Sequence, residues 1–136
     1  MKKAEKKVSL NKVENKVSLS LREYENKKIL FRLFNTKKNK SKSFSIYEKA
    51  KKSTTIKEAF NNDYRKIDIE YDTTKNNRFK KVNLLVDINS YLDKSKKDLY
   101  LDLIASNKSF VKENNITDKN ILDNISYFEK RINEIK

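Results

Sequence analysis

The first half of the chain alternates between apolar and polar positions with the period expected of half-buried strands. Residues 17–21 place Val and Leu at every second position, between serines and an arginine, and a strand points successive side chains to opposite faces. The run at 29–34 is apolar except for one arginine and predicts a second strand. Residues 44–47 begin a third strand or enter a helix. These segments together predict a hairpin whose long polar tip is 35–43.

The middle of the chain carries a helix signal followed by further alternation. Thr55 and Glu58 have the spacing of a capping box, which predicts a short helix that ends near 61–62. Apolar and acidic residues then alternate over 67–71, and apolar residues occupy every second position of 82–88. This pattern predicts a second hairpin, with a turn between the two strands.

In the last third of the chain, the apolar period changes to that of a helix. Leu99 and Leu103 are four residues apart, as are Tyr100 and Ile104, so a helix of about three turns is expected here. Thr117 is the expected N-cap of a final helix. The apolar residues of that helix recur at intervals of four and three: Ile121, Ile125, Phe128, Ile132 and Ile135. This face would pack on the protein's own sheet or, alternatively, form a homo-oligomer or dock onto a partner protein.

The order of these segments predicts an α+β fold: a small antiparallel sheet of β-hairpins, about four or five strands, followed by two or three C-terminal helices. Residues 1–15 are expected to be a basic flexible tail. Residues 16–136 would then form one domain. Its parts would be a basic β-rich segment at 16–52, a short helix plus hairpin at 53–94, and a helical segment at 95–136.

The positive charge is concentrated at the front of the chain. Residues 1–52 hold 17 Lys and Arg against 5 Glu, which gives +12 of the total formal charge of +14. A one-sided positive field attracts polyanions. The excess of Lys (28) over Arg (5) is typical of an AT-rich coding sequence, but that bias alone does not explain why basic residues outnumber acidic ones.

The basic segment also contains aromatic residues, and this combination predicts a nucleic-acid-binding surface. Lys side chains neutralise phosphates, and aromatic rings can stack on unpaired bases. The expected binding residues are Lys27, Lys28, Arg32, Lys37, Lys38, Lys40, Lys42, Tyr24 and Tyr47. The alternative for the aromatic residues is a place in the hydrophobic core. Because Arg is the usual reader of guanine edges and is rare here, non-specific backbone contact is favoured.

The composition excludes several kinds of chemistry. The chain has no Gly, Cys or His, so glycine-rich phosphate loops, disulfides and imidazole acid–base catalysis are ruled out. Backbone positions with positive φ must be occupied by Asn, Asp or Lys. Asp68, Glu70 and Asp72 would share one strand face and could hold a divalent ion in a nuclease, but an exposed face paired with Lys80 or Lys81 is the favoured interpretation.

The sequence therefore favours a small, basic, non-enzymatic nucleic-acid-binding protein without a metal or other cofactor, from a phage or other mobile element. The alternative is a structural or interaction protein, such as a virion component or an inhibitor of a host nucleic-acid machine. No apolar run reaches the length of a membrane span, and the basic start of the chain is followed by polar residues. A cytoplasmic location, or a virion or host cytoplasm, is expected.

Overall fold

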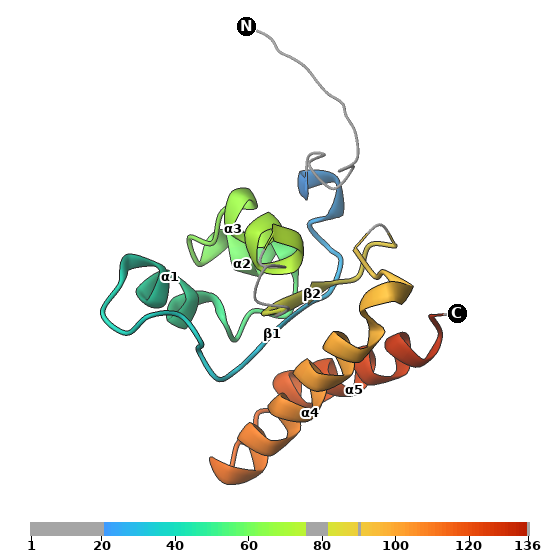
Figure 1. Cartoon of the computed structure of the whole chain (residues 1–136). Helices are drawn as coiled ribbons and strands as arrows, with labels where there is room; N and C mark the ends of the chain where they lie inside the picture. Colours follow the sequence, from blue (N-terminus) through green and yellow to red (C-terminus); the bar gives the residue numbers. More distant parts are fainter. Residues whose placement is uncertain (1–20, 76–81, 90, 136) are drawn as a thin grey trace, which may run out of the picture.

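The computed structural model describes residues 21–75, 82–89 and 91–135. These described residues form two short strands, five α-helices and three shorter helical turns (Figure 1). The strands are β1 (Ile29–Phe31) and β2 (Leu84–Val86). The α-helices are α1 (Lys42–Ala50), α2 (Ile56–Asn61), α3 (Lys66–Glu70), α4 (Lys97–Glu113) and α5 (Lys119–Asn133). The shorter turns are η3 (Leu21–Tyr24), the π-helical η4 (Tyr71–Lys75) and η6 (Lys94–Lys96).

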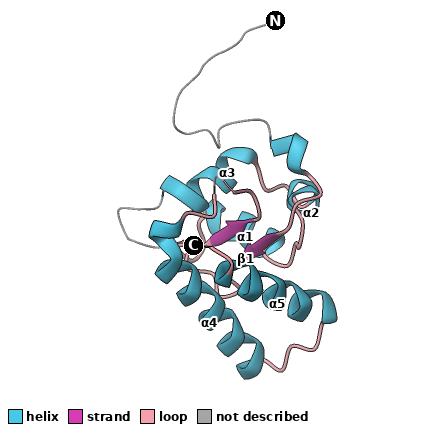
Figure 2. Cartoon of the chain, turned by 90° about the vertical axis from the view of Figure 1, so that its right-hand side faces the viewer, coloured by secondary structure: helices cyan, strands magenta, loops and turns pink. Residues whose placement is uncertain are grey.

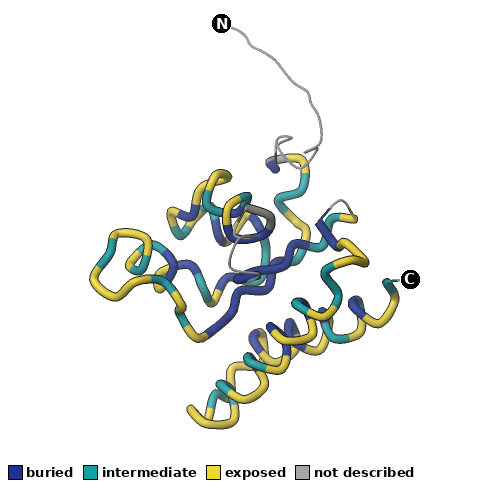
Figure 3. The backbone as a smooth tube through the Cα atoms, in the orientation of Figure 1, coloured by how far each residue is buried: buried dark blue, intermediate teal, exposed yellow. Residues whose placement is uncertain are grey.

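β1 and β2 form an antiparallel ribbon that lies between two groups of helices (Figures 1 and 2). Ile29 and Phe31 of β1 pack in a core with α1, α2 and α3, whereas Leu30 packs in a second core with α4 and α5. All six strand residues are buried, and the tube of Figure 3 is buried throughout this ribbon. The apolar character of β1 is therefore explained by a strand that is covered on both faces, whereas Phe34 at the end of the 29–34 run is exposed.

The expected sheet of four or five strands is wrong, because the part of the chain described here contains a single two-stranded sheet. Residues 44–47 belong to α1, and 67–71 belong to α3 and η4. The strand expected at 82–88 does form at β2, but it pairs with β1 instead of with 67–71. Most of the strand expected at 17–21, and the whole tail expected at 1–15, lie outside the described residues. The broader prediction of an α+β fold is consistent with the structure, which contains both helices and an antiparallel sheet.

The helices expected after Thr55, around Leu99–Ile104 and after Thr117 are present. The side chain of Thr55 accepts a hydrogen bond from the Glu58 amide at 3.1 Å and caps α2. α4 runs for 17 residues, which is longer than the sequence pattern indicated. The cap of α5 is Asp118 rather than Thr117, because the Asp118 carboxylate accepts from the Asn120 amide at 2.9 Å.

The apolar face of α5 packs against the protein's own core. Its buried residues are Ile121, Ile125, Phe128 and Ile132, and Ile135 is partly buried beside them. They share this core with Leu30 of β1 and with α4. The face is thus covered within the protein's own fold in this structure, and its alternative use for a partner or a second copy stays a prediction.

Among the residues that the structure describes, three have positive φ, and they are the residue types expected in a chain without glycine: Lys40 (68°), Asp63 (70°) and Asn115 (52°). The last two end helices. After α4, the Ile116 amide donates to Val111 O at 3.0 Å and the Asn115 amide donates to Lys112 O at 3.4 Å. This hydrogen-bond pair is the Schellman motif, in which the left-handed residue is usually glycine.

Candidate nucleic-acid interface

The connection between β1 and α1 is a basic and mostly exposed segment. We call residues 37–42 the lysine loop. Lys38, Lys40 and Lys42 are exposed on it. Within residues 21–75, 82–89 and 91–135, no carboxylate pairs with their ammonium groups. These three cations are therefore available to a ligand.

Hydrogen bonds at both ends fix the backbone of the lysine loop. The Asn35 carboxamide donates to Phe44 O at 3.0 Å and accepts from the Lys37 amide at 2.9 Å. The Ser41 hydroxyl donates to Lys38 O at 2.7 Å and caps α1 by accepting from the Phe44 amide at 3.0 Å. No acidic residue occupies the first turn of α1, so the helix dipole adds to the positive potential of the loop.

An open cleft of about 470 Å³ lies beside the lysine loop, and we call it the tyrosine cleft. The loop and the start of α1 provide one wall through Lys37, Lys38, Ser41 and Ser43. The segment from α3 to η4 provides the other wall through Arg65, Ile67, Asp68, Tyr71 and Asp72. The cleft thus joins two segments that are separated by more than twenty residues of sequence.

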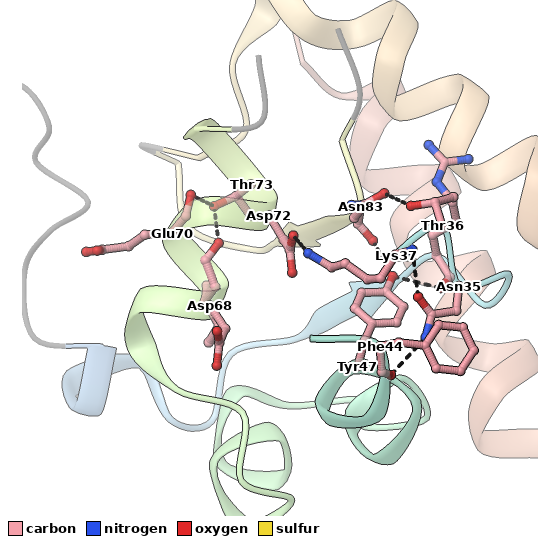
Figure 4. Close-up of polar contacts among 12 residues, drawn as sticks. Asn35, Thr36, Lys37, Phe44, Tyr47, Asp68, Glu70, Asp72, Thr73 and Asn83 are labelled. Carbon is pink, nitrogen blue, oxygen red and sulfur yellow. Dashed lines mark hydrogen bonds and ion pairs between the residues drawn. The ribbon is translucent and has the colours of Figure 1, made fainter. Parts of the chain in front are cut away.

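Asp72 forms the buried base of this cleft. Its residue exposure is 1 %, and Lys37 Nζ lies 2.5 Å from one carboxylate oxygen (Figure 4). The Tyr64 hydroxyl donates to the other oxygen. Burial raises the pKa of Asp72, and this effect exceeds the lowering of the pKa by the hydrogen bond and charge of Lys37. Lys37 therefore neutralises a buried acid instead of offering a free charge.

Lys37 also lies over two tyrosine rings. Its Nζ is 5.2 Å from the ring centroid of Tyr71 and 5.8 Å from that of Tyr47. The two rings differ in exposure: Tyr71 is 47 % exposed, whereas Tyr47 is buried at 1 %. Of the two, only Tyr71 presents a ring to the cleft.

Two of the expected phosphate-binding cations are internal. Arg32 is buried, donates to Val82 O at 2.8 Å and lies 3.6 Å from the Asp102 carboxylate. Lys37 is held by Asp72 as described, and only 16 % of its side chain is exposed. Their sequence neighbourhood suggested a surface role, but the partners that hydrogen-bond or ion-pair with their side chains are at least 35 positions away, which the local pattern does not reveal.

The two tyrosines expected to stack on bases pack in or against the hydrophobic core. The Tyr47 hydroxyl shares its one proton between two backbone acceptors, Arg32 O at 2.8 Å and Asn83 O at 2.9 Å, deep between α1 and the ribbon. A base cannot reach this ring in this structure, so the stacking role for Tyr47 is corrected. Tyr24 is half-buried and packs against the core formed with α1, α2 and α3.

Lys27 and Lys28 lie apart from the lysine loop, because they precede β1 and the loop follows it. Lys27 is exposed, whereas Lys28 is half-buried with its Nζ 5.9 Å from the Tyr127 ring centroid. The structure thus divides the expected basic cluster between the two ends of a strand. Only Lys38, Lys40 and Lys42 form a continuous exposed group.

The three acids that were considered as a metal site do not share a strand face. They lie on α3 and η4, where Asp72 faces Lys37 and Glu70 points away from it (Figure 4). Arg65 binds the Asp68 carboxylate through two guanidinium nitrogens, at 2.9 and 3.0 Å. Among the residues that the structure describes, no group of three acidic side chains is placed to hold a metal ion.

The sequence interpretation missed Arg65, Ile67 and Tyr71 because the segment 67–71 was expected to be a strand. Ile67 is 57 % exposed and lies one helical turn before Tyr71 on the same wall of the cleft. Their spacing of four residues is the only sequence signal that would have placed them together.

Comparisons of this chain with protein-family models, with curated proteins and with solved structures found no match. In the described ranges, no helix has the length and apolar character needed to cross a bilayer. The functional proposal below therefore depends on the chemistry of the lysine loop and the tyrosine cleft.

Proposed function

We propose that this protein binds nucleic acid without enzymatic activity, through contacts from the lysine loop to backbone phosphates. The observation that supports the proposal is the group formed by Lys38, Lys40 and Lys42. All three are exposed, unpaired among the described residues and carried by one hydrogen-bonded connection. Binding to phosphates releases condensed counterions, and this makes closely spaced lysines effective ligands for a polyanion.

The cations of this region favour phosphate contact over the recognition of base sequence. Bidentate contact with guanine is most often made by the guanidinium group of a free Arg. Arg32 is buried, and Arg65 already binds Asp68 with its side chain. Lys is a compact charge that binds phosphate without reading a base edge. We therefore propose weak sequence specificity, and a cytoplasmic, virion or host-cytoplasmic setting where nucleic acid is accessible.

A salt titration tests this proposal. The affinity for a labelled oligonucleotide would be measured by fluorescence anisotropy at several salt concentrations, for the wild type and for the triple variant Lys38→Ser, Lys40→Ser, Lys42→Ser. Loss of three phosphate contacts should reduce the slope of log K against log salt by about 2 to 3. A matched control removes three exposed, unpaired lysines elsewhere: Lys94→Ser, Lys112→Ser, Lys130→Ser. Equal effects of the two triple variants would contradict the assignment to the loop.

A protein partner is the second candidate, and one observation favours it. Phe34 is 60 % exposed immediately before the lysine loop, and exposed aromatic residues are enriched in protein interfaces. If the basic segment docks onto an acidic protein, Phe34→Ser should weaken that complex while leaving the salt slope for nucleic acid unchanged. Co-purification of one stoichiometric protein free of nucleic acid would favour this second function.

A further inference from the structure

We infer that the tyrosine cleft accepts one unpaired nucleobase stacked on Tyr71, so that the protein binds single strands in preference to duplexes. This inference rests on the proposed function and specifies its ligand. The first observation is the exposure of Tyr71 (47 %) and Ile67 (57 %), two large apolar side chains on the same wall of one cleft. Stacking the face of a planar base against both side chains removes this surface from water.

The ring of Tyr71 is positioned before any ligand arrives. Lys37 Nζ lies 5.2 Å from its centroid, and Lys37 is itself fixed by the buried carboxylate of Asp72 at 2.5 Å. The cation holds the ring through its π face, while nearly half of the side chain stays accessible. A ring that is already oriented loses less conformational entropy when a base stacks on it.

The size and the polar lining of the cleft suit a nucleotide. Its volume of about 470 Å³ lies within the range of roughly 300–1,000 Å³ that is typical of small-molecule sites. Lys38, Ser41 and Ser43 line the opposite wall, which continues into the exposed lysines of the loop. With the base on Tyr71, the phosphates on either side of it would follow the lysine loop.

Placing a base in the cleft costs more free energy for a duplex than for a single strand. Its bases are paired and stacked, and extruding one requires the loss of these interactions. The lysine loop can still contact the duplex backbone, because phosphate contact does not depend on the strandedness of the ligand. The two parts of the surface therefore make separable contributions: the loop to every nucleic acid, and Tyr71 to single strands.

The test compares a labelled oligothymidine single strand with a duplex of equal length, for four proteins: wild type, Tyr71→Ala, Tyr71→Phe and the lysine-loop triple variant. Tyr71→Ala should weaken single-strand binding roughly 5- to 150-fold and leave duplex binding unchanged. Tyr71→Phe, which keeps the ring, should retain the single-strand affinity. The triple variant should weaken both ligands. Equal loss of both ligands in Tyr71→Ala, or no loss of either, overturns the inference.

A second measurement reports on the cleft directly. The chain contains no tryptophan, so Tyr71→Trp introduces a single tryptophan at the stacking position, which can be excited selectively over the remaining tyrosines. Its emission should be quenched by the single strand and not by the duplex. Tight binding of thymidine monophosphate alone, with no gain for the oligonucleotide, would overturn the inference in favour of a free nucleotide. Absence of any nucleic-acid binding by the wild type refutes the proposed function itself, whereas binding that ignores Tyr71 refutes only this inference.

Discussion

The carboxamide of Asn107 completes the hydrogen bonding of the β1 edge at Phe31. Its Nδ2 donates to Phe31 O at 2.9 Å, and its Oδ1 accepts from the Leu33 amide at 2.8 Å. Asn124 of α5 likewise donates to Ile29 O at 2.8 Å. Side chains from two helices thus satisfy the backbone groups that a third strand would otherwise pair. This arrangement explains how a ribbon of two strands can be buried in the centre of the protein.

Replacement of Asn107 by Leu should therefore destabilise the fold strongly. Leu has a similar size, but it leaves the Phe31 carbonyl and the Leu33 amide without partners in a fully buried position. Each unsatisfied group costs about 1–3 kcal/mol, so urea denaturation should show a loss of about 2–5 kcal/mol or no folded state. The control is Asn120→Leu at an exposed position of α5. A similar stability of the two variants would contradict the role assigned to Asn107.

At the end of α4, a substitution is expected to stabilise the protein. Asn115 has a φ of 52° in a Schellman motif, where glycine is free of steric cost. Asn115→Gly should raise the free energy of unfolding by up to about 1 kcal/mol, and Asn115→Val should lower it by about 1–2 kcal/mol. Thermal denaturation of the two variants would measure the difference. Equal melting temperatures would show that the left-handed backbone at this position carries no strain.

Lys40 allows charge and stability to be separated within the lysine loop. Its φ is 68°, so Lys40→Gly removes a cation and relieves a left-handed non-glycine residue at once. The variant should melt at or above the temperature of the wild type and still bind nucleic acid more weakly, with a salt slope reduced by about 1. Lys112→Ala serves as a control for charge loss on α4. Unchanged affinity would remove Lys40 from the interface.

The buried acid Asp72 should leave a signature in the pH dependence of stability. Burial raises its pKa in the folded protein above the ordinary value of 3.8, despite the opposing effects of Lys37 and Asn83. In the window between the ordinary and the raised pKa, the folded state binds more protons than the unfolded state, so this group's contribution to stability falls as pH rises.

The variant Asp72→Asn has an uncharged side chain at this position. It tests whether the contribution of Asp72 to stability falls as pH rises. Its stability relative to the wild type should increase as the pH rises through that window and stay constant above it. Urea denaturation at several pH values between about 3.5 and 8 would follow the difference. A relative stability that instead decreases with rising pH would indicate that the ion pair with Lys37 outweighs the burial of the carboxylate.

The sequence was informative where a local signal was sufficient. The pair Thr55 and Glu58 predicted the start of α2, and the four-and-three spacing of α5 predicted its buried face. The absence of glycine predicted that Lys, Asp or Asn would occupy positions with positive φ. Each of these features depends on residues within one or two turns of the chain, so the tertiary structure had little to change.

The strand predicted at 67–71 is wrong because the sequence pattern of this segment fits both a strand and a helix. Ile67, Ile69 and Tyr71 alternate as in a strand, but five residues of alternation do not exclude a helix. In the folded protein, Ile69 is buried in the core while Ile67 and Tyr71 are exposed on the cleft. With β2 paired to β1, this segment had no strand partner within the described fold and formed α3 and η4.

The candidate site was predictable in part. The charge pattern indicated that the polar segment before α1 would be exposed, and Lys38, Lys40 and Lys42 are exposed there. It gave no sign that Lys37 would bind Asp72 or that Arg32 would donate to Val82, because these partners are 35 and 50 residues away in sequence. The cleft was hidden for a similar reason, because its two walls, the lysine loop with the start of α1 and the segment from α3 to η4, are separated by more than twenty residues of sequence.

By itself, the sequence determined the helices with strong caps and period, the left-handed positions and the excess of positive charge near its start. The tertiary structure alone decided how many strands the sheet has, which lysines are free and which ring faces the cleft. The physical reason is the range of the interactions: caps and helical periodicity act between near neighbours, whereas the burial of Tyr47 and the exposure of Tyr71 depend on packing between segments far apart in the chain.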